Sequence, residues 1–586
     1  MSDGKLTPGG RAYGDFKAKF MKIKDLVKGL KVAIDGNPET EISGIVYDSR
    51  DAYAGCLFAA LHGTREEGKK YIGDAAAKGA AAVLTDDSGV KAGDLGRAIT
   101  LLACDDVSET LGEVSSKFFG SPSASMKIFA VTGTNGKTTI TYLLEEIFKG
   151  QSVNLGVIGT ISYRYGPVNI PAPNTTPQSS DLHRILRQMK DLGADGAAME
   201  VSSHGLVQGR ISGCDIDAAI FTNLTREHLD YHKTMEEYKN AKSLLFEKYL
   251  AKSAKKDKFS VINLDDPCGK ELVNTAAGGI ITYGINSDAR IKASGISAGR
   301  DGTDFTMEIE GRKMRVRTKL VGTYNIYNIL AAAGCAFSQN ADMTKVAESI
   351  EKFRPAPGRF ETINAGQPFT AIVDYAHTPD ALENILSAVR AIEHGKIITV
   401  FGCGGDRDRS KRPLMGEISC RLSDYTVITS DNPRSENPER IALDVEVGFQ
   451  RIKCQNYEVI IDRAKAIEKA IGMCGTNDIL VVAGKGHEDY QIIGEKKIHF
   501  SDRETLTALL AEKYGKNETL KLVGRYWKET YHSPFDEYHP ETDDLSGIVE
   551  DAKLLFHVGT DLANSSEWPA WNKNSEFKTI RDQSRK

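Results

Sequence analysis

The run Thr132-Gly133-Thr134-Asn135-Gly136-Lys137-Thr138-Thr139 constrains the fold more than any other feature of this chain. It lies between an apolar stretch at 128–131 and a helix-like stretch at 142–148. A strand, a glycine-rich turn, Lys-Thr and a helix in this order form a phosphate-binding loop, because backbone N–H groups and the helix N-terminus face the anion. Lys137 is then placed to reach the outer phosphates, and Thr138 to ligate Mg2+. The sequence therefore predicts a nucleoside triphosphate site in an α/β domain.

Short apolar runs recur along the chain from about residue 127 and alternate with amphipathic stretches, which is typical of α/β domains with parallel sheets. A cluster of polar and charged residues follows each run. The runs lie at 128–131, 197–201, 218–222, 371–373, 397–401, 425–429 and 479–483. Ligands of open parallel sheets bind outside the carboxyl ends of the strands. We therefore expect the polar clusters to converge on shared clefts.

The chain has 586 residues, which is too long for a single core and predicts several domains. Two prolines and a glycine interrupt the pattern at 353–358, and a second break falls around 119–123. We expect an N-terminal extension, a small mixed αβ domain, a central domain, a C-terminal domain and a C-terminal extension, at 1–20, 21–124, 125–354, 355–515 and 516–586. All three tryptophans lie in the last segment, where we expect a folded stretch around 545–557.

Composition argues against several classes of partner. Lys and Arg number 75 and Asp and Glu 80, so a net charge of −5 provides no general attraction to nucleic acid or acidic membrane. Nine cysteines occur singly, without a CxxC pair, which favours free thiols in a reducing compartment over disulfides or a zinc site. No apolar run approaches the roughly 20 residues that span a bilayer, and the polar start is unlike a signal peptide. We expect a cytoplasmic protein with no nucleic-acid partner and no membrane insertion.

Five motifs together resemble the Mur ligase family. They are Asp48-Ser49-Arg50, the phosphate loop at 133–139, Glu200-Val201-Ser202-Ser203-His204, Asn325-Ile326-Tyr327-Asn328 and Gly358-Arg359-Phe360-Glu361. The resemblance covers roughly residues 21–515. It implies three domains: an N-terminal domain for a UDP-sugar, a central P-loop ATPase domain with a mainly parallel sheet, and a C-terminal Rossmann-like domain for an amino acid. It also implies a monomer.

Two later motifs, Asp374-Tyr375-Ala376-His377-Thr378-Pro379 and Asp431-Asn432-Pro433-Arg434, point to one reaction within the family. By resemblance, the substrates are UDP-N-acetylmuramoyl-L-alanyl-D-glutamate and meso-2,6-diaminopimelate, with ATP and Mg2+ as cofactors. ATP would phosphorylate the glutamyl carboxylate, and the amine would attack the acyl phosphate. The expected product is a peptidoglycan precursor.

The resemblance also implies roles for individual residues. The expected catalytic residues are Lys137, Glu200, His228 and Lys242, and the expected metal ligands are Thr138, Glu200, His228 and Lys242 as a carbamate. Besides the phosphate loop (Gly133, Thr134, Asn135, Gly136, Lys137, Thr138 and Thr139), the expected ATP ligands are Asn325, Asn328, Arg359, Asp374 and His377. The UDP-substrate is assigned to Ser49, His62, Asn174, Thr175, Thr176, Ser202, Gln208 and Arg210.

Diaminopimelate differs from lysine by a second carboxylate, so a selective pocket needs a cation for that group and acceptors for the distal ammonium. The resemblance assigns this pocket to Arg407, Asp431, Asn432, Pro433, Arg434, Gly484 and Glu488. Arg434 is the expected discriminating residue, because an unpaired buried arginine would penalise lysine.

Several alternatives remain open at this point: a lysine-adding ligase, a folylpolyglutamate synthetase, an ATP-driven P-loop switch and an inactive scaffold. The Asp-Asn-Pro-Arg loop and the long N-terminal domain argue against the first two. The polar clusters of the C-terminal domain argue against a switch, and the complete set of expected catalytic residues argues against a scaffold.

Overall fold

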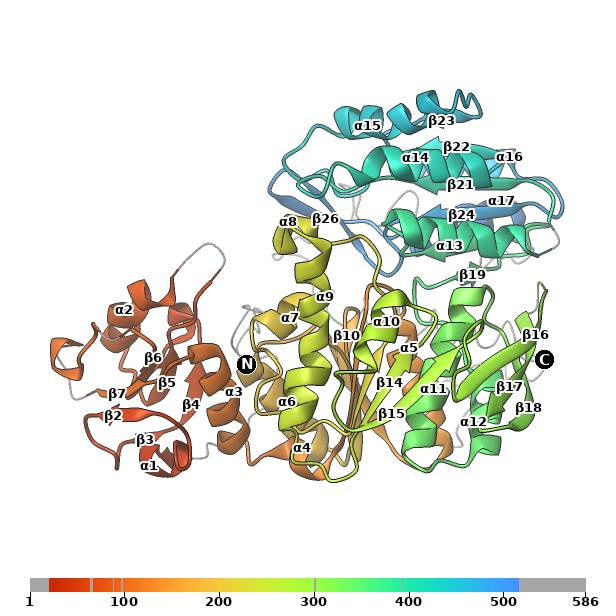
Figure 1. Ribbon diagram of the computed structural model, residues 1–586. Helices are drawn as coiled ribbons and strands as arrows, with labels where there is room; N and C mark the ends of the chain where they lie inside the picture. Colours follow the sequence, from red (N-terminus) through yellow and green to blue (C-terminus); the bar gives the residue numbers. More distant parts are fainter. Residues whose placement is uncertain are drawn as a thin grey trace, which may run out of the picture.

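The computed structural model describes residues 20–515 except 64–66, 88, 96–98, 300–301 and 393. These residues form three bodies, each built around its own large sheet (Figure 1). Each sheet lies within one of the three domains expected from the sequence. The expected folded stretch at 545–557 lies outside the described residues, as does almost all of the N-terminal extension. No described helix is long and apolar enough to cross a membrane.

The N-terminal body contains a five-stranded sheet of order β2-β7-β6-β5-β4, which is parallel except for the β2–β7 pair. Its central strands β5 and β6 are buried along their whole length, as apolar runs covered on both faces should be. A second, antiparallel pair joins β1 to β3. The strands are β1 (Met21–Lys22), β2 (Ala33–Asp35), β3 (Glu41–Ile42), β4 (Gly44–Val46), β5 (Cys56–Ala59), β6 (Ala82–Thr85) and β7 (Thr100–Ala103). The helices are α1 (Ile23–Leu26), η1 (Ser49–Asp51), η2 (Gly68–Tyr71), α2 (Ile72–Ala77), η3 (Ala92–Leu95) and α3 (Val107–Phe118).

The central body contains an eleven-stranded sheet of order β11-β10-β9-β12-β8-β13-β14-β15-β16-β17-β18. Neighbouring strands from β9 to β16 in this order pair in parallel, and the strands beyond them at each end pair antiparallel. The strands are β8 (Lys127–Thr132), β9 (Leu155–Ile158), β10 (Ser162–Tyr165), β11 (Val168–Pro171), β12 (Gly196–Glu200), β13 (Ala218–Phe221), β14 (Phe259–Asn263), β15 (Gly279–Gly284), β16 (Ile291–Gly299), β17 (Gly302–Ile309) and β18 (Arg312–Thr318).

Helices pack on this sheet and connect its strands (Figure 1). They are α4 (Pro122–Ser125), α5 (Lys137–Gly150), α6 (Ser179–Asp191), α7 (Ser203–Val207), α8 (Leu229–His232), α9 (Met235–Leu244), a π-helical turn η4 (Leu245–Leu250), α10 (Pro267–Leu272), α11 (Thr323–Ser338) and α12 (Met343–Lys352). The apolar faces of α5 and α11 meet in one core cluster, where Leu144 and Ile329 are fully buried.

Two glycines fix the turn between β8 and α5. Gly133 has φ 145°, and a Cβ there would lie 1.7 Å from Thr222 Oγ1. Gly136 has φ 94°, and a Cβ there would lie 2.3 Å from Asn328 Oδ1. Both positions therefore combine a left-handed backbone with a close neighbour, which only glycine tolerates without strain. As a result, α5 begins at Lys137, and its N-terminus directly follows the glycine-rich turn.

The C-terminal body contains a six-stranded sheet of order β19-β20-β24-β21-β22-β23, parallel except for the β19–β20 pair. A separate hairpin joins β25 to β26. The strands are β19 (Glu361–Ile363), β20 (Thr370–Asp374), β21 (Ile397–Phe401), β22 (Tyr425–Ile428), β23 (Tyr457–Val459), β24 (Ile479–Ala483), β25 (Tyr490–Ile493) and β26 (Lys496–His499). The helices are α13 (Pro379–Arg390), α14 (Lys411–Leu422), α15 (Pro438–Arg451), α16 (Arg463–Met473) and α17 (Asp502–Tyr514).

The structure corrects one expectation from the sequence. Cys420 of α14 and Cys454, just after α15, form a disulfide with an S–S distance of 2.04 Å, so the prediction of free thiols throughout is wrong for these two. The other seven cysteines are free. The packing of α14 against α15 brings together two cysteines that are 34 residues apart, and no local spacing signals such a pair.

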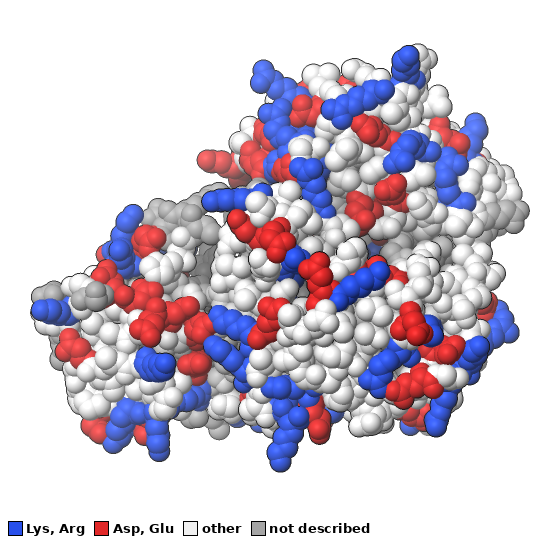
Figure 2. All heavy atoms as spheres, in the orientation of Figure 1, with Lys and Arg blue, Asp and Glu red and all other residues white. Residues whose placement is uncertain are grey.

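Acidic and basic side chains are interspersed over the face shown in Figure 2, in keeping with the small net charge. This face therefore offers no extended field of one sign for recognition.

Candidate functional site

The phosphate loop gathers two lysines, of which Lys242 is buried and Lys137 half-buried. Lys137 Nζ donates to the carbonyl oxygens of Gly133 at 2.9 Å and Thr134 at 2.8 Å, and Lys242 Nζ donates to the same Gly133 oxygen at 2.8 Å. Burial lowers the pKa of both lysines, and the charge of Lys137 further lowers the pKa of Lys242, which falls well below its usual value. Lys242 is therefore unlike the solvated charge usual for a helical lysine.

Thr138 and Glu200 form the second part of the site. Thr138 Oγ1 donates to Glu200 Oε1 at 2.9 Å, and Glu200 is 1% exposed at the end of β12. Thr160 holds the same carboxylate through its backbone N–H and its hydroxyl, both at 2.9 Å. From the C-terminal domain, Arg359 Nη2 donates to Thr138 Oγ1 at 3.3 Å. The structure thus brings together Lys137, Thr138, Glu200 and Arg359, as expected from the sequence.

His228 lies beside these groups with a left-handed backbone of φ 56°. Burial is the main cause that lowers its pKa to about 4, so its ring is neutral near pH 7 and keeps a nitrogen lone pair. Its ring centroid lies 5.0 Å from that of His204 and 5.9 Å from that of Tyr238. Lys242 Nζ lies 4.4 Å from the same Tyr238 ring, so His228 and Lys242 both contact this tyrosine.

The described residues contain no cluster of three or more His, Cys, Asp or Glu side chains that could hold a metal ion. Thr138 and Glu200 nevertheless supply adjacent hard oxygens of the kind that Mg2+ prefers. Lys242 as an amine is a poor Mg2+ ligand, whereas a carbamate would present oxygens. The Thr138–Glu200 pair therefore fits Mg2+ directly, and the His228–Lys242 pair fits it only with the modified lysine.

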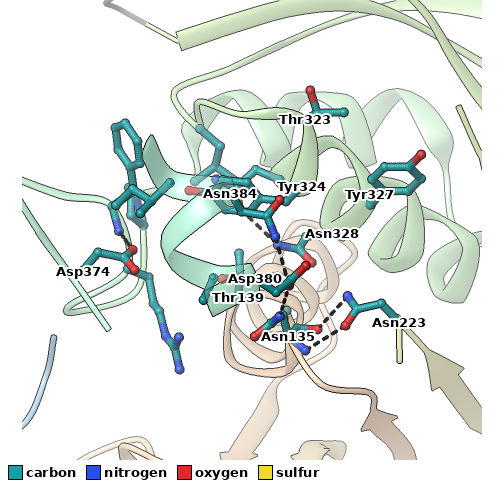
Figure 3. A pocket seen from close by; sticks show the side chains of 18 of the residues that line it. Asn135, Thr139, Asn223, Thr323, Tyr324, Tyr327, Asn328, Asp374, Asp380 and Asn384 are labelled. Atoms are coloured by element: carbon teal, nitrogen blue, oxygen red, sulfur yellow. Dashed lines mark hydrogen bonds between the residues drawn. The ribbon is translucent and has the colours of Figure 1, made fainter. Parts of the chain in front are cut away.

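A cavity of about 280 Å3 opens between the central and C-terminal domains (Figure 3). Asn325 and Asn328 of α11 line it, as do Arg359 and Asp374 from the C-terminal side. Asn135, Gly136 and Thr139 of the phosphate loop and α5 close its other end. Burial raises the pKa of Asp374, which accepts hydrogen bonds from the backbone N–H groups of Phe360 and Ala376.

Direct contacts join the two domains around this cavity. Asn135 Nδ2 donates to Asp380 Oδ2 at 2.6 Å, and Asn384 Nδ2 donates to the same oxygen at 3.1 Å (Figure 3). His377 does not line the cavity, and its Nε2 lies 3.3 Å from Glu227 Oε1. Burial opposes ionisation of Glu227, but the bond from His377 and nearby positive charges outweigh it and lower its pKa.

Sequence reasoning did not assign Glu227, Asp380 or Asn384 to the site. Glu227 directly precedes His228 in the cluster after β13, so its position at a strand end was the available signal. Asp380 and Asn384 lie on one face of α13 and look like ordinary first-turn and surface residues. Only the docking of the two domains shows that they reach the phosphate loop.

Four of the residues assigned to the UDP-substrate meet beside Glu200. Thr176 Oγ1 donates to Glu200 O at 3.0 Å and lies 3.3 Å from Ser202 Oγ. Arg210 donates to Thr176 O at 2.8 Å and to Gln208 Oε1 at 3.0 Å. A polar path therefore runs from Arg210 to the phosphate loop.

The other members of this set are less closely joined. The Asn174 carbonyl accepts a bond from Tyr163, and Thr175 Oγ1 lies 3.1 Å from Thr160 Oγ1. Ser49 and His62 lie in the N-terminal domain. His62 is bonded to Glu67 and Asp86, which raise its pKa, and its side chain is 55% exposed.

The residues assigned to the amino acid lie beyond the carboxyl ends of β21, β22 and β24. Arg434 has a left-handed backbone of φ 51°, and its Nη1 donates to Gly405 O at 2.8 Å. A Cβ placed on Gly404 would lie 3.0 Å from Arg434 Nη1 and 3.8 Å from Arg407 Cγ, whereas the guanidinium of the exposed Arg407 donates to Asp406 O at 3.1 Å. Pro433 O lies against Gly405, where a Cβ would be 1.9 Å away.

The two strand-end loops are bonded to each other. Asn432 Nδ2 donates to Glu488 Oε2 at 2.9 Å. Asp431 is 7% exposed, and Gly484 begins the facing loop with φ 116°. The structure thus brings together the loops that carry the expected amino-acid ligands. The buried Lys485 lies here as well. It was not assigned to the site, because nothing in the sequence distinguishes it from other lysines.

Three family models match the chain. They describe a Mur ligase family catalytic domain at residues 41–117, a Mur ligase middle domain at 131–336 and a Mur ligase glutamate ligase domain at 358–486. Curated relatives named UDP-N-acetylmuramoyl-L-alanyl-D-glutamate--2,6-diaminopimelate ligase include one from Caldanaerobacter subterraneus subsp. tengcongensis, 41% identical over 84% of this chain and 99% of the relative. Another, from Geobacillus kaustophilus, is 42% identical over 84% of this chain and 100% of the relative.

Solved structures agree with these matches. One, a UDP-N-acetylmuramoyl-L-alanyl-D-glutamate--2,6-diaminopimelate ligase, shares 33% identity and a TM-score of 0.62, over 85% of this chain and all of the other. The MurF ligase of Thermotoga maritima, solved with ADP, shares the fold at a TM-score of 0.53 and 18% identity, over 75% of this chain and 93% of the other. The chain belongs to the Mur ligase family.

Proposed function

We propose that this protein uses ATP to join meso-2,6-diaminopimelate to UDP-N-acetylmuramoyl-L-alanyl-D-glutamate. The observation that carries the proposal is the position of Arg434, with Arg407 on the adjoining loop, close to the hydrogen-bonded Asn432–Glu488 pair. This arrangement pairs cations for a carboxylate with acceptors for an ammonium, which is the charge pattern of a diamino dicarboxylic acid. Relatives at 41% and 42% identity carry the name of this reaction.

Phosphoryl transfer needs positive groups around the transferring phosphate and close alignment of the attacking oxygen. The N-terminus of α5 and Lys137 supply the first requirement, with Lys137 turning from the loop carbonyls to the β- and γ-phosphates. Arg359 adds a second cation from the C-terminal domain, so domain closure completes the site. Asn325, Asn328 and Asp374 are suited to the adenine and ribose.

Thr138 and Glu200 would hold Mg2+, and Lys242 as a carbamate would hold a second ion with His228. Bound Mg2+ neutralises charge on the phosphates. Lys242 would form the carbamate when its neutral amine attacks carbon dioxide and releases one N–H proton to solvent, which its lowered pKa favours. The polar path from Arg210 through Thr176 orients the dipeptide so that its glutamyl carboxylate faces the γ-phosphate.

The amine of diaminopimelate then attacks the acyl phosphate, and phosphate leaves. Asp431 and Glu488 would hold the distal ammonium while Arg434 and Arg407 hold the distal carboxylate. The N-terminal domain, through Ser49 and His62, would bind the UDP end. The cytoplasmic location, the monomeric state and the domain limits remain predictions from the sequence.

Steady-state phosphate release tests the proposal, with ATP, Mg2+ and the UDP-dipeptide present and meso-diaminopimelate compared with L-lysine. We expect release to require both substrates and to prefer diaminopimelate strongly. Preference for lysine would indicate the lysine-adding alternative. Release that is indifferent to any amino acid would support the ATP-driven switch and contradict the proposal.

A further inference from the structure

Lys485 is a buried cation directly behind the proposed amino-acid site. It follows Gly484 in the loop after β24, and its side chain is fully buried. Its Nζ lies 3.6 Å from Asp431 Oδ1 and 3.3 Å from Glu488 Oε2, and it donates to the carbonyl of Tyr490. The side chains of Asp431 and Glu488 are 9% and 16% exposed, so both carboxylates are more accessible than the lysine that contacts them.

The neighbouring buried arginine is already paired. Arg463 of α16 makes two bonds of 2.6 Å to Asp502, and both side chains are fully buried. Lys485 therefore forms the ion pairs with Asp431 and Glu488, while Arg463, which is bonded to Asp502, also attracts both carboxylates electrostatically. Two carboxylates against one ammonium leave one negative charge, which a single ammonium group of an incoming amino acid would balance.

The same contacts fix geometry as well as charge. Lys485 and Asn432 both donate to Glu488 Oε2, which leaves the other carboxylate oxygen, Oε1, facing the Tyr375 hydroxyl at 3.4 Å. Lys485 also bridges the loop after β24 to Asp431 in the loop after β22. Its ammonium thus sets both the spacing of the two loops and the orientation of Glu488.

We propose that Lys485 is a positioning residue that holds Asp431 and Glu488 in the arrangement that receives an ammonium group of the diamino acid. This inference rests on the proposed function of the site. If Lys485 lost its charge, the two carboxylates would lose the cation that they share, and Glu488 Oε2 would lose one of its two donors. Amino-acid binding would then weaken without an effect on ATP.

The test compares KM values for meso-diaminopimelate, measured by phosphate release at saturating ATP and UDP-dipeptide. The variants are Lys485→Met, Lys485→Gln, Lys485→Arg, Glu488→Gln and the double variant Lys485→Met/Glu488→Gln. Lys485→Gln is the second uncharged variant, included in case Lys485→Met does not fold. Its amide keeps a donor for the Tyr490 carbonyl but lacks the charge. Lys465→Met removes a lysine that is 74% exposed in the same domain and serves as the control.

We expect Lys485→Met and Lys485→Gln to raise the KM for diaminopimelate at least about tenfold, with the KM for ATP unchanged. Lys485→Arg should recover most of the loss. In the Glu488→Gln background, Lys485→Met should add less than about threefold, because the two residues act through one contact.

A normal KM for diaminopimelate in both uncharged variants would overturn the inference, as would equal effects in the two backgrounds. Failure of the proposed function looks different, because the unaltered protein would then release no phosphate in response to diaminopimelate.

Discussion

Lys137 and Lys242 both donate to the carbonyl oxygen of Gly133, and this contact shows how burial changes the pKa of single residues at the site. Burial lowers the pKa of Lys242, and repulsion from the Lys137 ammonium at the same oxygen lowers it further. The glycine-rich loop and its lysine were predictable from their spacing. The role of Lys242 came only from family resemblance, because nothing in its local sequence distinguishes it from a surface lysine.

Arg434 should decide the choice of amino acid. We predict that Arg434→Ala raises the KM for meso-diaminopimelate by the equivalent of about 2 to 4 kcal/mol, because a cation for the distal carboxylate is lost. The preference for diaminopimelate over L-lysine should shrink in parallel. Arg440→Ala is the matched control, since Arg440 is exposed in the first turn of α15 just beyond the same loop. Unchanged selectivity in Arg434→Ala would count against the pocket.

His183 should make stability depend on pH. It is fully buried in α6, where burial lowers its pKa to about 4 although its ring is hydrogen-bonded to Ser212 O. Between pH 6.5 and 4 the unfolded chain therefore binds a proton that the folded chain excludes, so stability falls as the pH falls, by about 2 kcal/mol at pH 5.

Thermal unfolding at pH 7 and pH 5 tests this effect of His183. The Tm of His183→Gln should drop less between the two values than that of the unaltered protein, because the glutamine keeps a donor for Ser212 but does not titrate. Equal drops would show that His183 does not contribute to the acid sensitivity.

At the scale of elements, strand ends organise both halves of the site. The apolar runs correctly marked β8, β12, β13, β20, β21, β22 and β24, and the polar clusters after them lie at the two clefts. The hairpin β25–β26 was not predicted. Its backbone nevertheless holds the loop that carries Arg434. Arg434 N donates to Ile492 O at 3.0 Å, and Gly494 N donates to Arg434 O at 2.8 Å.

A substitution at Gly136 can test whether the close approach of the phosphate loop to α11 matters for ATP binding. We predict that Gly136→Ala raises the KM for ATP at least about tenfold, because the added methyl group meets Asn328 and strains a left-handed backbone. Gly311→Ala is the control, since Gly311 has a similar φ of 83° but open space around it. Kinetic titration with ATP measures both variants. An equal effect of the two changes would show that the approach of Asn328 is unimportant.

At the scale of the whole molecule, a few polar contacts join the central domain to the C-terminal domain. Asn135–Asp380, Glu227–His377 and Thr138–Arg359 all link the phosphate loop region to the C-terminal domain. The sequence indicated three folded segments, because each has its own set of apolar runs. It could not show the docking, since contacts between residues 150 or more positions apart leave no periodic signal.

The segment beyond the described fold should not contribute to ligation. We predict that deletion of residues 520–586 leaves kcat and the three substrate KM values within about twofold of the full chain, because the expected site residues all precede residue 490. Steady-state phosphate release measures this, with circular dichroism to show that the truncated protein is folded. A folded truncation that has lost turnover would place part of the function in the deleted segment.

The most direct test of the account follows an oxygen atom. UDP-N-acetylmuramoyl-L-alanyl-D-glutamate labelled with oxygen-18 in the glutamyl carboxylate is converted with ATP and meso-diaminopimelate, and the released phosphate is analysed by mass spectrometry. Attack of that carboxylate on the γ-phosphate predicts one labelled oxygen in the phosphate for each amide bond formed. Unlabelled phosphate, with all the label retained in the peptide product or the unreacted dipeptide, would contradict an acyl-phosphate ligase.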